Sequence, residues 1–265
     1  MKSRIAAHGG LRAAAPFITI AAVLLAWLLA TRVLGAPAML LPDPWLTLQG
    51  LWAGLRSGEI LLDAWATVSA AAVGYAIGAG VAFVLAAAMA LSRPIERLLV
   101  VPVMAFQSIP KVALAPLIYI WIGFGMRSSV ALVALACIYP VFVNSFIGFR
   151  SVDAALIDLY RASGAGPLRI LWSVRLPSAA PQVFVGLEVS VVFALLAAVV
   201  MELVAGERGL GVRIQSASTT LDMATVFGAV AVLAAIGVSA SATLRAVRRR
   251  IVFWQREEAL VEATA

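Results

Sequence analysis

The chain has 265 residues, of which 63% are hydrophobic and 12% are charged, whereas soluble globular domains have about 25% charged residues. It contains one histidine and one cysteine, which argues against a zinc site, a disulfide framework or a Ser-His-Asp hydrolase. Its two lysines, Lys2 and Lys111, follow no glycine-rich phosphate loop, so we expect no Walker A ATPase site. No catalytic, cofactor or metal-binding residue is predicted.

Six apolar segments follow one another along the chain, near 16–30, 61–91, 98–122, 128–149, 179–204 and 223–244. Several of them reach the roughly 20 residues that an α-helix needs to cross a bilayer. We therefore predict an all-α, polytopic membrane protein with about six transmembrane helices. The second segment is long enough to tilt in the membrane or to begin as an interfacial helix.

The first apolar segment has features of both a retained transmembrane helix and a cleaved signal peptide. Lys2, Arg4 and Arg12 precede it and Gly35-Ala36-Pro37-Ala38 follows it, a pattern also found in cleaved signal peptides. Multi-span proteins more often retain such a segment, so we interpret it as the first transmembrane helix. The residues after Leu41-Pro42-Asp43-Pro44-Trp45 predict an interfacial helix before the second span.

The distribution of basic residues predicts the orientation. With the N-terminus in the cytoplasm, 14 of the 20 Lys and Arg residues lie on the cytoplasmic side, five lie outside, and Lys111 falls within the third span. Because basic residues accumulate on the cytoplasmic side, both termini and the segment between the fourth and fifth spans are expected there. The net charge of +7 then reflects topology, and no nucleic-acid partner is expected.

Residues 150–181, here called the 150–181 loop, form a polar interruption between the fourth and fifth spans. Ser151 is predicted to cap a first short helix, with Asp153 in its first turn near the positive end of the helix dipole. Gly164 and Gly166 are expected to end that helix, since glycine readily terminates helices.

Pro167 is predicted to begin a second short helix, because its missing N–H would be unpaired at that position anyway. Pro177 and Pro181 are expected to stop this helix and to start the fifth span. Two short amphipathic helices on one face of a membrane protein indicate a rigid docking surface for a partner. The alternative is an ordinary solvated loop.

A few polar groups lie within the apolar segments, and each has two readings. Lys111 is either an electropositive point on the path of an anion, or a structural side chain that snorkels or pairs with a carboxylate such as Glu188. The others either line a passage or form hydrogen bonds to a neighbouring helix: Gln107, Ser108, Asn144 and Glu202. The glycine-rich segment 206–221 is either a flexible turn or a gate and external binding surface.

The 150–181 loop resembles the EAA loop of permease subunits from ATP-binding-cassette importers. Gly164, Val174, Leu176 and Pro177 match its glycine–hydrophobic–leucine–proline frame without a gap. Asp158-Leu159-Tyr160 stands where the family commonly has Glu-Ala-Ala, so the acid is kept and the two alanines are lost. Further stretches resemble the nitrate/sulfonate/taurine-type branch: residues 108–117, 121–125, 150–153, and Glu202 followed by 209–211.

The resemblance covers roughly residues 60–245 and implies the fold of a type I importer permease. It implies three parts in chain order. Residues 1–60 contain an N-terminal tail, the first span and the interfacial segment, residues 61–245 form the permease core with the 150–181 loop, and residues 246–265 form a cytoplasmic tail. It also implies a bacterial inner-membrane location and partners: a cytoplasmic ATPase dimer, a periplasmic substrate-binding protein and a second permease copy, with a homodimer expected.

The implied role is that of a non-enzymatic subunit that carries a small solute, expected to be an anion such as nitrate, a sulfonate or taurine. The residues implied to couple to the ATPase are Asp158, Arg161, Ala162, Gly164, Ala165, Gly166, Val174, Leu176 and Pro177. Those expected along the translocation path are Gln107, Ser108, Lys111, Asn144 and Glu202. The alternative is an autonomous secondary transporter or channel, which would normally need midplane carboxylates and an inverted repeat.

Overall fold

The computed structural model describes residues 18–254, and within them every regular element is helical. This confirms the all-α prediction. The basic residues Lys2, Arg4, Arg12 and Arg256, the only histidine, His8, and the two chain termini lie outside the described residues. The described residues form two compact units: a smaller one with residues up to Ile60 and Arg213–Ala231, and a larger one with Leu61–Val212 and the residues after Ala231.

The smaller unit contains the apolar helix Ile18–Arg32 and helix α2 (Pro44–Ser57). Asp43 caps α2 by accepting the N–H of Trp45 at 2.7 Å, and Pro44 occupies the first turn. The amide of Trp45 and the guanidinium of Arg32 hold the pKa of Asp43 below its usual range, because both stabilise the carboxylate. The helix predicted after residue 41 is therefore present.

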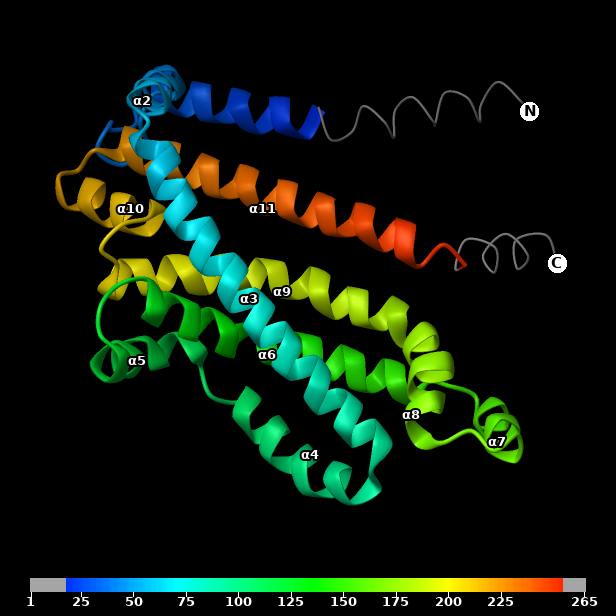
Figure 1. Cartoon of the computed structure of the whole chain (residues 1–265). Helices are drawn as coiled ribbons and strands as arrows, with labels where there is room; N and C mark the ends of the chain where they lie inside the picture. Colours follow the sequence, from blue (N-terminus) through cyan, green and yellow to red (C-terminus); the bar gives the residue numbers. More distant parts are fainter. Residues whose placement is uncertain (1–17, 255–265) are drawn as a thin grey trace, which may run out of the picture. The chain divides into compact units, whose positions relative to one another are not determined.

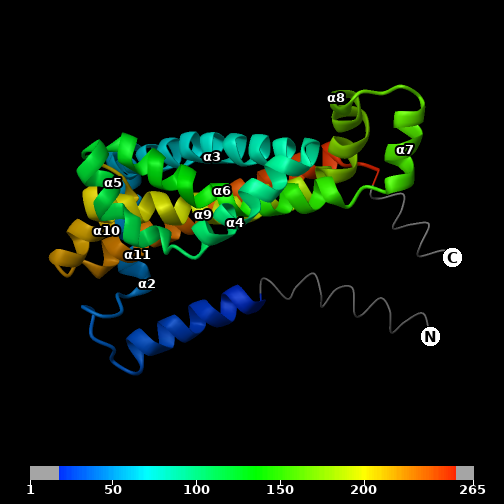
Figure 2. The ribbon, with the colours of Figure 1, turned by 90° about the horizontal axis from the view of Figure 1, so that it is seen from below.

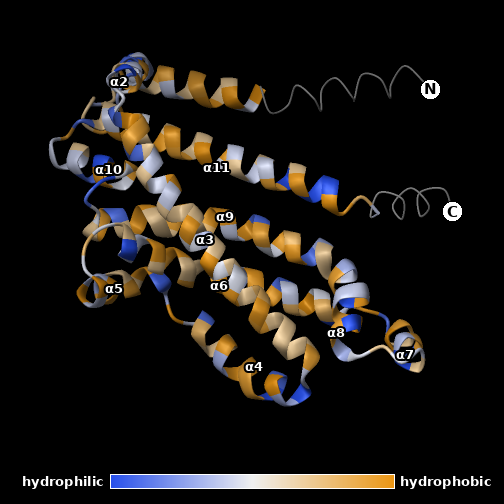
Figure 3. Ribbon diagram, in the orientation of Figure 1, coloured by the Kyte–Doolittle hydropathy of each residue, from blue (hydrophilic) through white to orange (hydrophobic). Residues whose placement is uncertain are grey.

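Long apolar helices dominate the rest of the chain: α3 (Glu59–Leu91), α6 (Met126–Arg150), α9 (Leu176–Ala205) and α11 (Met223–Ile251). Among the described residues, four helices are long and apolar enough to span a membrane, or five if one bent pair counts as a span. Within the larger unit, α3, α6 and α9 run between α5 at one end and α7 and α8 at the other (Figures 1 and 2). Figure 3 shows that most of their residues are hydrophobic.

The third predicted span is not one straight helix. Helix α4 (Arg93–Gln107) ends before Pro110, and a 3₁₀ turn, η1 (Lys111–Leu114), leads into α5 (Ala115–Ile122) at a bend of 85°. Proline lacks an N–H and disfavours helical geometry in the residue before it, which explains the break at Ile109-Pro110. With this bent pair and the short helix Ile18–Arg32, the predicted count of six is met approximately.

Small residues allow the long helices of the larger unit to approach one another closely. A Cβ added to Gly74 of α3 would lie 2.5 Å from Cβ of Val133 in α6. One added to Gly186 of α9 would lie 2.8 Å from the carbonyl oxygen of Pro140 in α6. Cys137 is fully buried in this core, as expected for a small hydrophobic side chain. Gly74 and Gly186 are therefore needed for the close packing of the helices.

Candidate functional site

The 150–181 loop begins with helix α7 (Ala154–Ala162). Its cap is Asp153, whose carboxylate accepts the N–H of Ala155 at 2.9 Å. The prediction that Ser151 caps this helix was wrong, because Ser151 instead ends α6 and donates its hydroxyl to Gly148 O at 2.9 Å. Gly164 follows α7 with φ of +78°, a left-handed conformation that glycine adopts without strain.

The second part of the loop is continuous with the fifth span. Helix α8 (Pro167–Ile170) passes into a π-helical turn, η2 (Leu171–Arg175), and then directly into α9. The prediction that Pro177 and Pro181 stop the second short helix was wrong, whereas the fifth span does begin beside Pro177. Pro177 lies in the first turn of α9, directly after the wider π turn, and Pro181 is accommodated inside α9. Residues 167–205 therefore form one extended helical run.

One side of this run is fixed to the rest of the larger unit. Ile170, Leu171 and Val174 are buried. The guanidinium of Arg175 donates a hydrogen bond to the carbonyl oxygen of Ala90, at the C-terminal end of α3. The second half of the loop is thus held rigidly against the membrane helices.

Both α7 and the start of this run present apolar side chains to the surroundings. Leu159 of α7 is 61% exposed, and Leu168 of α8 and Trp172 of the π turn are each 63% exposed. None of the residues of α7 is buried. Exposed large hydrophobic side chains on a fixed support are typical of a protein–protein contact surface.

The structure brings the predicted coupling residues together on this loop. Asp158 and Arg161 form an exposed ion pair on α7 at 3.1 Å, and Ala162 is the last residue of that helix. The others lie in the turn between α7 and α8 or at the start of the long helix: Gly164, Ala165, Gly166, Val174, Leu176 and Pro177. Of these, Val174 is the buried anchor.

The break in the third span exposes several of the predicted path residues. Gln107 and Ser108 are exposed where α4 ends. The ammonium group of Lys111 donates to Gln107 O at 3.1 Å and lies 5.7 Å from the ring centre of Tyr139. Glu188 does not pair with Lys111, because it pairs with Arg248 of α11 at 3.4 Å.

Asn144 donates to the carbonyl oxygen of Pro140 at 2.8 Å, within its own helix. Its Cβ also contacts the backbone of α9 at Gly186. The local geometry favours a structural hydrogen bond for Asn144.

Glu202 lies in a hydrogen-bonded network near the end of α9. Its side chain is buried and accepts the hydroxyl of Thr67 at 2.9 Å and the N–H of Gly211 at 2.8 Å. The Thr67 hydroxyl oxygen in turn accepts the N–H of Leu210 at 2.9 Å. The network therefore holds the start of α10 (Leu210–Thr219) against α3 and α9, so the segment 206–221 is not a simple flexible turn.

Sequence reasoning missed two features of this part of the structure, a hydrogen bond and an ion pair. Thr67 was not singled out, since threonine within an apolar segment carries little signal. The ion pair between Arg208 and Asp63, 3.6 Å apart, was also missed. The glycines around Leu210 were the available signal, because a Cβ on Gly209 or Gly211 would collide with Glu202.

Residues 74–253 match the model of the family described as the binding-protein-dependent transport system inner membrane component. The chain belongs to this family. Its members are permease subunits of ATP-binding-cassette importers, transport components rather than enzymes, and they are inner-membrane proteins.

Curated relatives match the chain over most of its length. It is 34% identical to the riboflavin transport system permease protein RibX of Chloroflexus aurantiacus, over 90% of this chain and 89% of the relative. It is 32% identical to the taurine permease TauC of Escherichia coli, over 87% and 86%. It is 28% identical to the putative aliphatic sulfonates permease SsuC of the same organism, over 94% and 95%.

Solved structures share the fold. The inward-facing methionine transporter MetNI aligns with a TM-score of 0.58 at 18% sequence identity, covering 78% of this chain and 96% of the other. An amino acid ABC transporter aligns with the same TM-score at 16% identity, covering 76% and 96%. The predicted type I importer permease fold is therefore confirmed.

Proposed function

We propose that this permease forms the translocation path for a small solute and couples its movement to a cytoplasmic ATPase through the 150–181 loop. The observation that carries the proposal is the two-sided construction of the loop. Its buried residues and Arg175 fix it to the membrane helices, while Leu159, Leu168 and Trp172 face outward. A partner that moves this surface would move the fifth span with it.

The proposed assembly contains two permease copies, a cytoplasmic ATPase dimer that hydrolyses ATP, and a periplasmic substrate-binding protein. Helix α4 supports a second copy, since none of its residues is buried within the single chain. The proposed orientation puts both termini and the 150–181 loop in the cytoplasm, in accord with the positive-inside rule. The division into an N-terminal part at 1–60, a permease core at 61–245 and a tail at 246–265 belongs to the same proposal.

We propose an anion of the sulfonate class as the solute. The relatives named for taurine and aliphatic sulfonates support this class, and so does Lys111 beside the exposed break in the third span. The proposed path residues are the five polar ones predicted from sequence: Gln107, Ser108, Lys111, Asn144 and Glu202. A flavin is the competing candidate because of the relative named for riboflavin.

Replacing Gly164 with leucine tests the coupling. Gly164 has φ of +78° and open space around the missing Cβ, so leucine causes backbone strain without a steric clash. The strain costs about 1–2 kcal/mol and is relieved by reshaping the turn between α7 and α8. We expect the purified permease to lose ATPase association, or to keep it while solute uptake no longer follows ATP hydrolysis.

Gly50→Leu is the matched control, since Gly50 also has open space around its missing Cβ but lies in the right-handed helix α2. It should leave co-purification and uptake unchanged. Uptake by the permease in proteoliposomes without any ATPase would contradict the proposal and restore the secondary-transporter reading.

The solute class is tested separately on the cognate substrate-binding protein. Thermal unfolding with taurine, alkyl sulfonates, nitrate and riboflavin should show an increased Tm for a sulfonate, because a ligand that binds only the folded state stabilises it. Stabilisation by riboflavin alone would replace the sulfonate proposal with the flavin one and leave the coupling proposal intact.

A further inference from the structure

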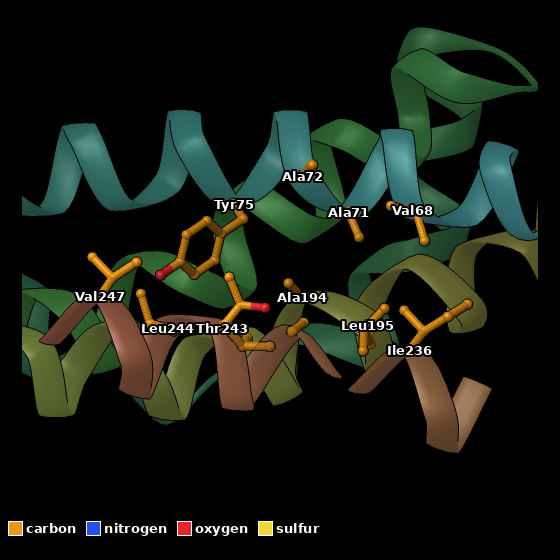
Figure 4. A pocket seen from close by; sticks show the side chains of 12 residues that line it. Val68, Ala71, Ala72, Tyr75, Ala194, Leu195, Ile236, Thr243, Leu244 and Val247 are labelled. Atoms are coloured by element: carbon orange, nitrogen blue, oxygen red, sulfur yellow. The ribbon is translucent and has the colours of Figure 1, made fainter. Parts of the chain in front are cut away.

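An apolar groove of about 340 Å³ lies within the larger unit, between α3, α9 and α11. Figure 4 shows Val68 and Tyr75 of α3 on one side, and Leu195 of α9 with Ile236 and Val247 of α11 on the other. Pockets of 300–1,000 Å³ are the usual size for small-molecule ligands. The groove is therefore large enough to hold a defined ligand.

The wall of this groove presents no unused polar group. Two hydroxyls line it, and both are donated to backbone carbonyl oxygens: Tyr75 to Leu187 at 3.2 Å and Thr243 to Ser239 at 2.8 Å. A sulfonate or another strongly hydrated solute would lose its hydration there without any hydrogen bond in return. The occupant must be a hydrocarbon, so the groove is distinct from the proposed solute path.

The length of the groove matches one leaflet of a bilayer. Along α11 its lining extends from Ile236 to Val247, which is about 16 Å at 1.5 Å per residue. Half of the hydrocarbon core of a bilayer measures about 15 Å. In the proposed orientation the Val247 end lies toward the cytoplasm, so the groove covers the inner leaflet.

Charged groups lie directly beside the cytoplasmic end of the lining. Arg248 directly follows Val247 and pairs with Glu188, which is seven residues before Leu195 and therefore on the same face of α9. At 100° per residue, Arg248 and Arg250 lie on either side of the α11 stripe that contains Leu244 and Val247. Arg250 is exposed, and Figure 3 shows the hydrophilic end of α11.

We propose that this groove binds one acyl chain of an anionic phospholipid from the inner leaflet, whose phosphate lies between Arg248 and Arg250. Basic groups at the cytoplasmic end of a cleft between transmembrane helices are suited to such headgroups. The proposal does not depend on which solute the permease carries.

Native mass spectrometry of the full chain tests the proposal. The protein is exchanged into detergent micelles containing equal amounts of phosphatidylglycerol and phosphatidylcholine with identical acyl chains. We expect retained phosphatidylglycerol to exceed phosphatidylcholine by about fivefold or more, the effect of one or more basic residues near an anionic headgroup. Equal retention of the two lipids would overturn the proposal.

Two variants separate the chain site from the headgroup site. Ala240→Phe fills the groove and should abolish retention of both lipids. Arg250→Gln should remove about fivefold of the preference while hydrocarbon is still bound. Arg248→Lys should keep the preference, since it retains the charge beside Glu188.

Val238→Phe is the matched control, because Val238 is exposed on the opposite face of the same helix. An equal loss of lipid in Val238→Phe and Ala240→Phe would refute a specific site. If Ala240→Phe instead turned a dimer into a monomer and left bound lipid unchanged, the groove would be an interface between copies and the proposal would be wrong.

Discussion

The carboxylate of Glu202 lies within a membrane-spanning helix, where an unpaired charge is costly. Its partners explain how it is tolerated, since it accepts the Thr67 hydroxyl and the N–H of Gly211. In the Glu202→Ala variant the Thr67 hydroxyl can still donate to the carbonyl oxygen of Asp63, 3.2 Å away. The N–H of Gly211, however, loses its acceptor. We expect the free energy of unfolding to fall by about 1–3 kcal/mol, measured as a lower Tm in detergent.

Glu207→Ala provides the comparison, because Glu207 is an exposed carboxylate five residues further along the chain. It should leave the Tm unchanged. Glu202→Gln retains one acceptor oxygen and should fall between the two. A Tm for Glu202→Ala equal to that of Glu207→Ala would mean that the network contributes nothing to stability.

The sequence could identify Glu202 as unusual but could not identify its partner. Thr67 is 135 residues away from it, and nothing in its neighbourhood marks it as a hydrogen-bond donor to an acid. Glu188 presents the same difficulty, because its partner Arg248 is 60 residues away in the chain. Partner choice depends on tertiary placement, which hydropathy does not contain.

At the scale of the helices, close approach of α3 to α6 depends on glycine. A Cβ on Gly78 would collide with the backbone of α6 at Ala134, whereas one on Gly80 meets nothing within 4 Å. We expect Gly78→Leu to lower stability by about 1–3 kcal/mol or more through overpacking, seen as aggregation on size-exclusion chromatography after extraction.

Gly80→Leu should remain monodisperse, since it lies two residues away in the same helix with open space around it. Both variants should insert into the membrane to the same extent, because leucine favours insertion. If Gly80→Leu aggregated like Gly78→Leu, added bulk anywhere on α3 rather than contact with α6 would be responsible.

The helices were predictable where composition alone decides the outcome. Long apolar runs predicted the bounds of α3, α6 and α9 within three residues, whereas α11 continues seven residues beyond the predicted end at 244. The glycine at 164 predicted the turn after α7. The angle of the bend in the third span, 85°, and the π turn at Leu171–Arg175 were not predicted. Hydropathy depends on the number of apolar residues and contains no information on the direction of the helix axis. Whether a proline is tolerated inside a helix depends on its neighbours.

At the scale of the whole molecule, the predicted orientation is testable with introduced cysteines. The sequence has one native cysteine, and Cys137 is buried, so Cys137→Ala provides a background without thiols. Ser163→Cys, in the 150–181 loop, should react with a membrane-impermeant maleimide only in inside-out vesicles. Ser57→Cys, at the end of α2, should react only from the outside of spheroplasts.

Both positions are exposed in the structure, so failure to react cannot be attributed to burial within the chain. Labelling of Ser163→Cys in intact spheroplasts would invert the topology and remove the 150–181 loop from the compartment that holds ATP. The groups that would recognise a particular solute were not predictable, because the sequence does not distinguish Asn144 and Glu202, whose side chains have hydrogen-bond partners within the chain, from the exposed Gln107 and Ser108.

The helical run from Pro167 to Ala205 is uninterrupted, so a movement of the 150–181 loop is transmitted along the whole of α9. Helix α9 has 30 residues and is about 45 Å long at 1.5 Å per residue, from the π turn that contains Trp172 to Glu202 near the far end. A rotation of about 5° at the first end would displace the second by about 4 Å over this helical length. Glu202 accepts the N–H of Gly211 at the start of α10. A displacement of Glu202 would therefore move the start of α10 directly, with no other element between them.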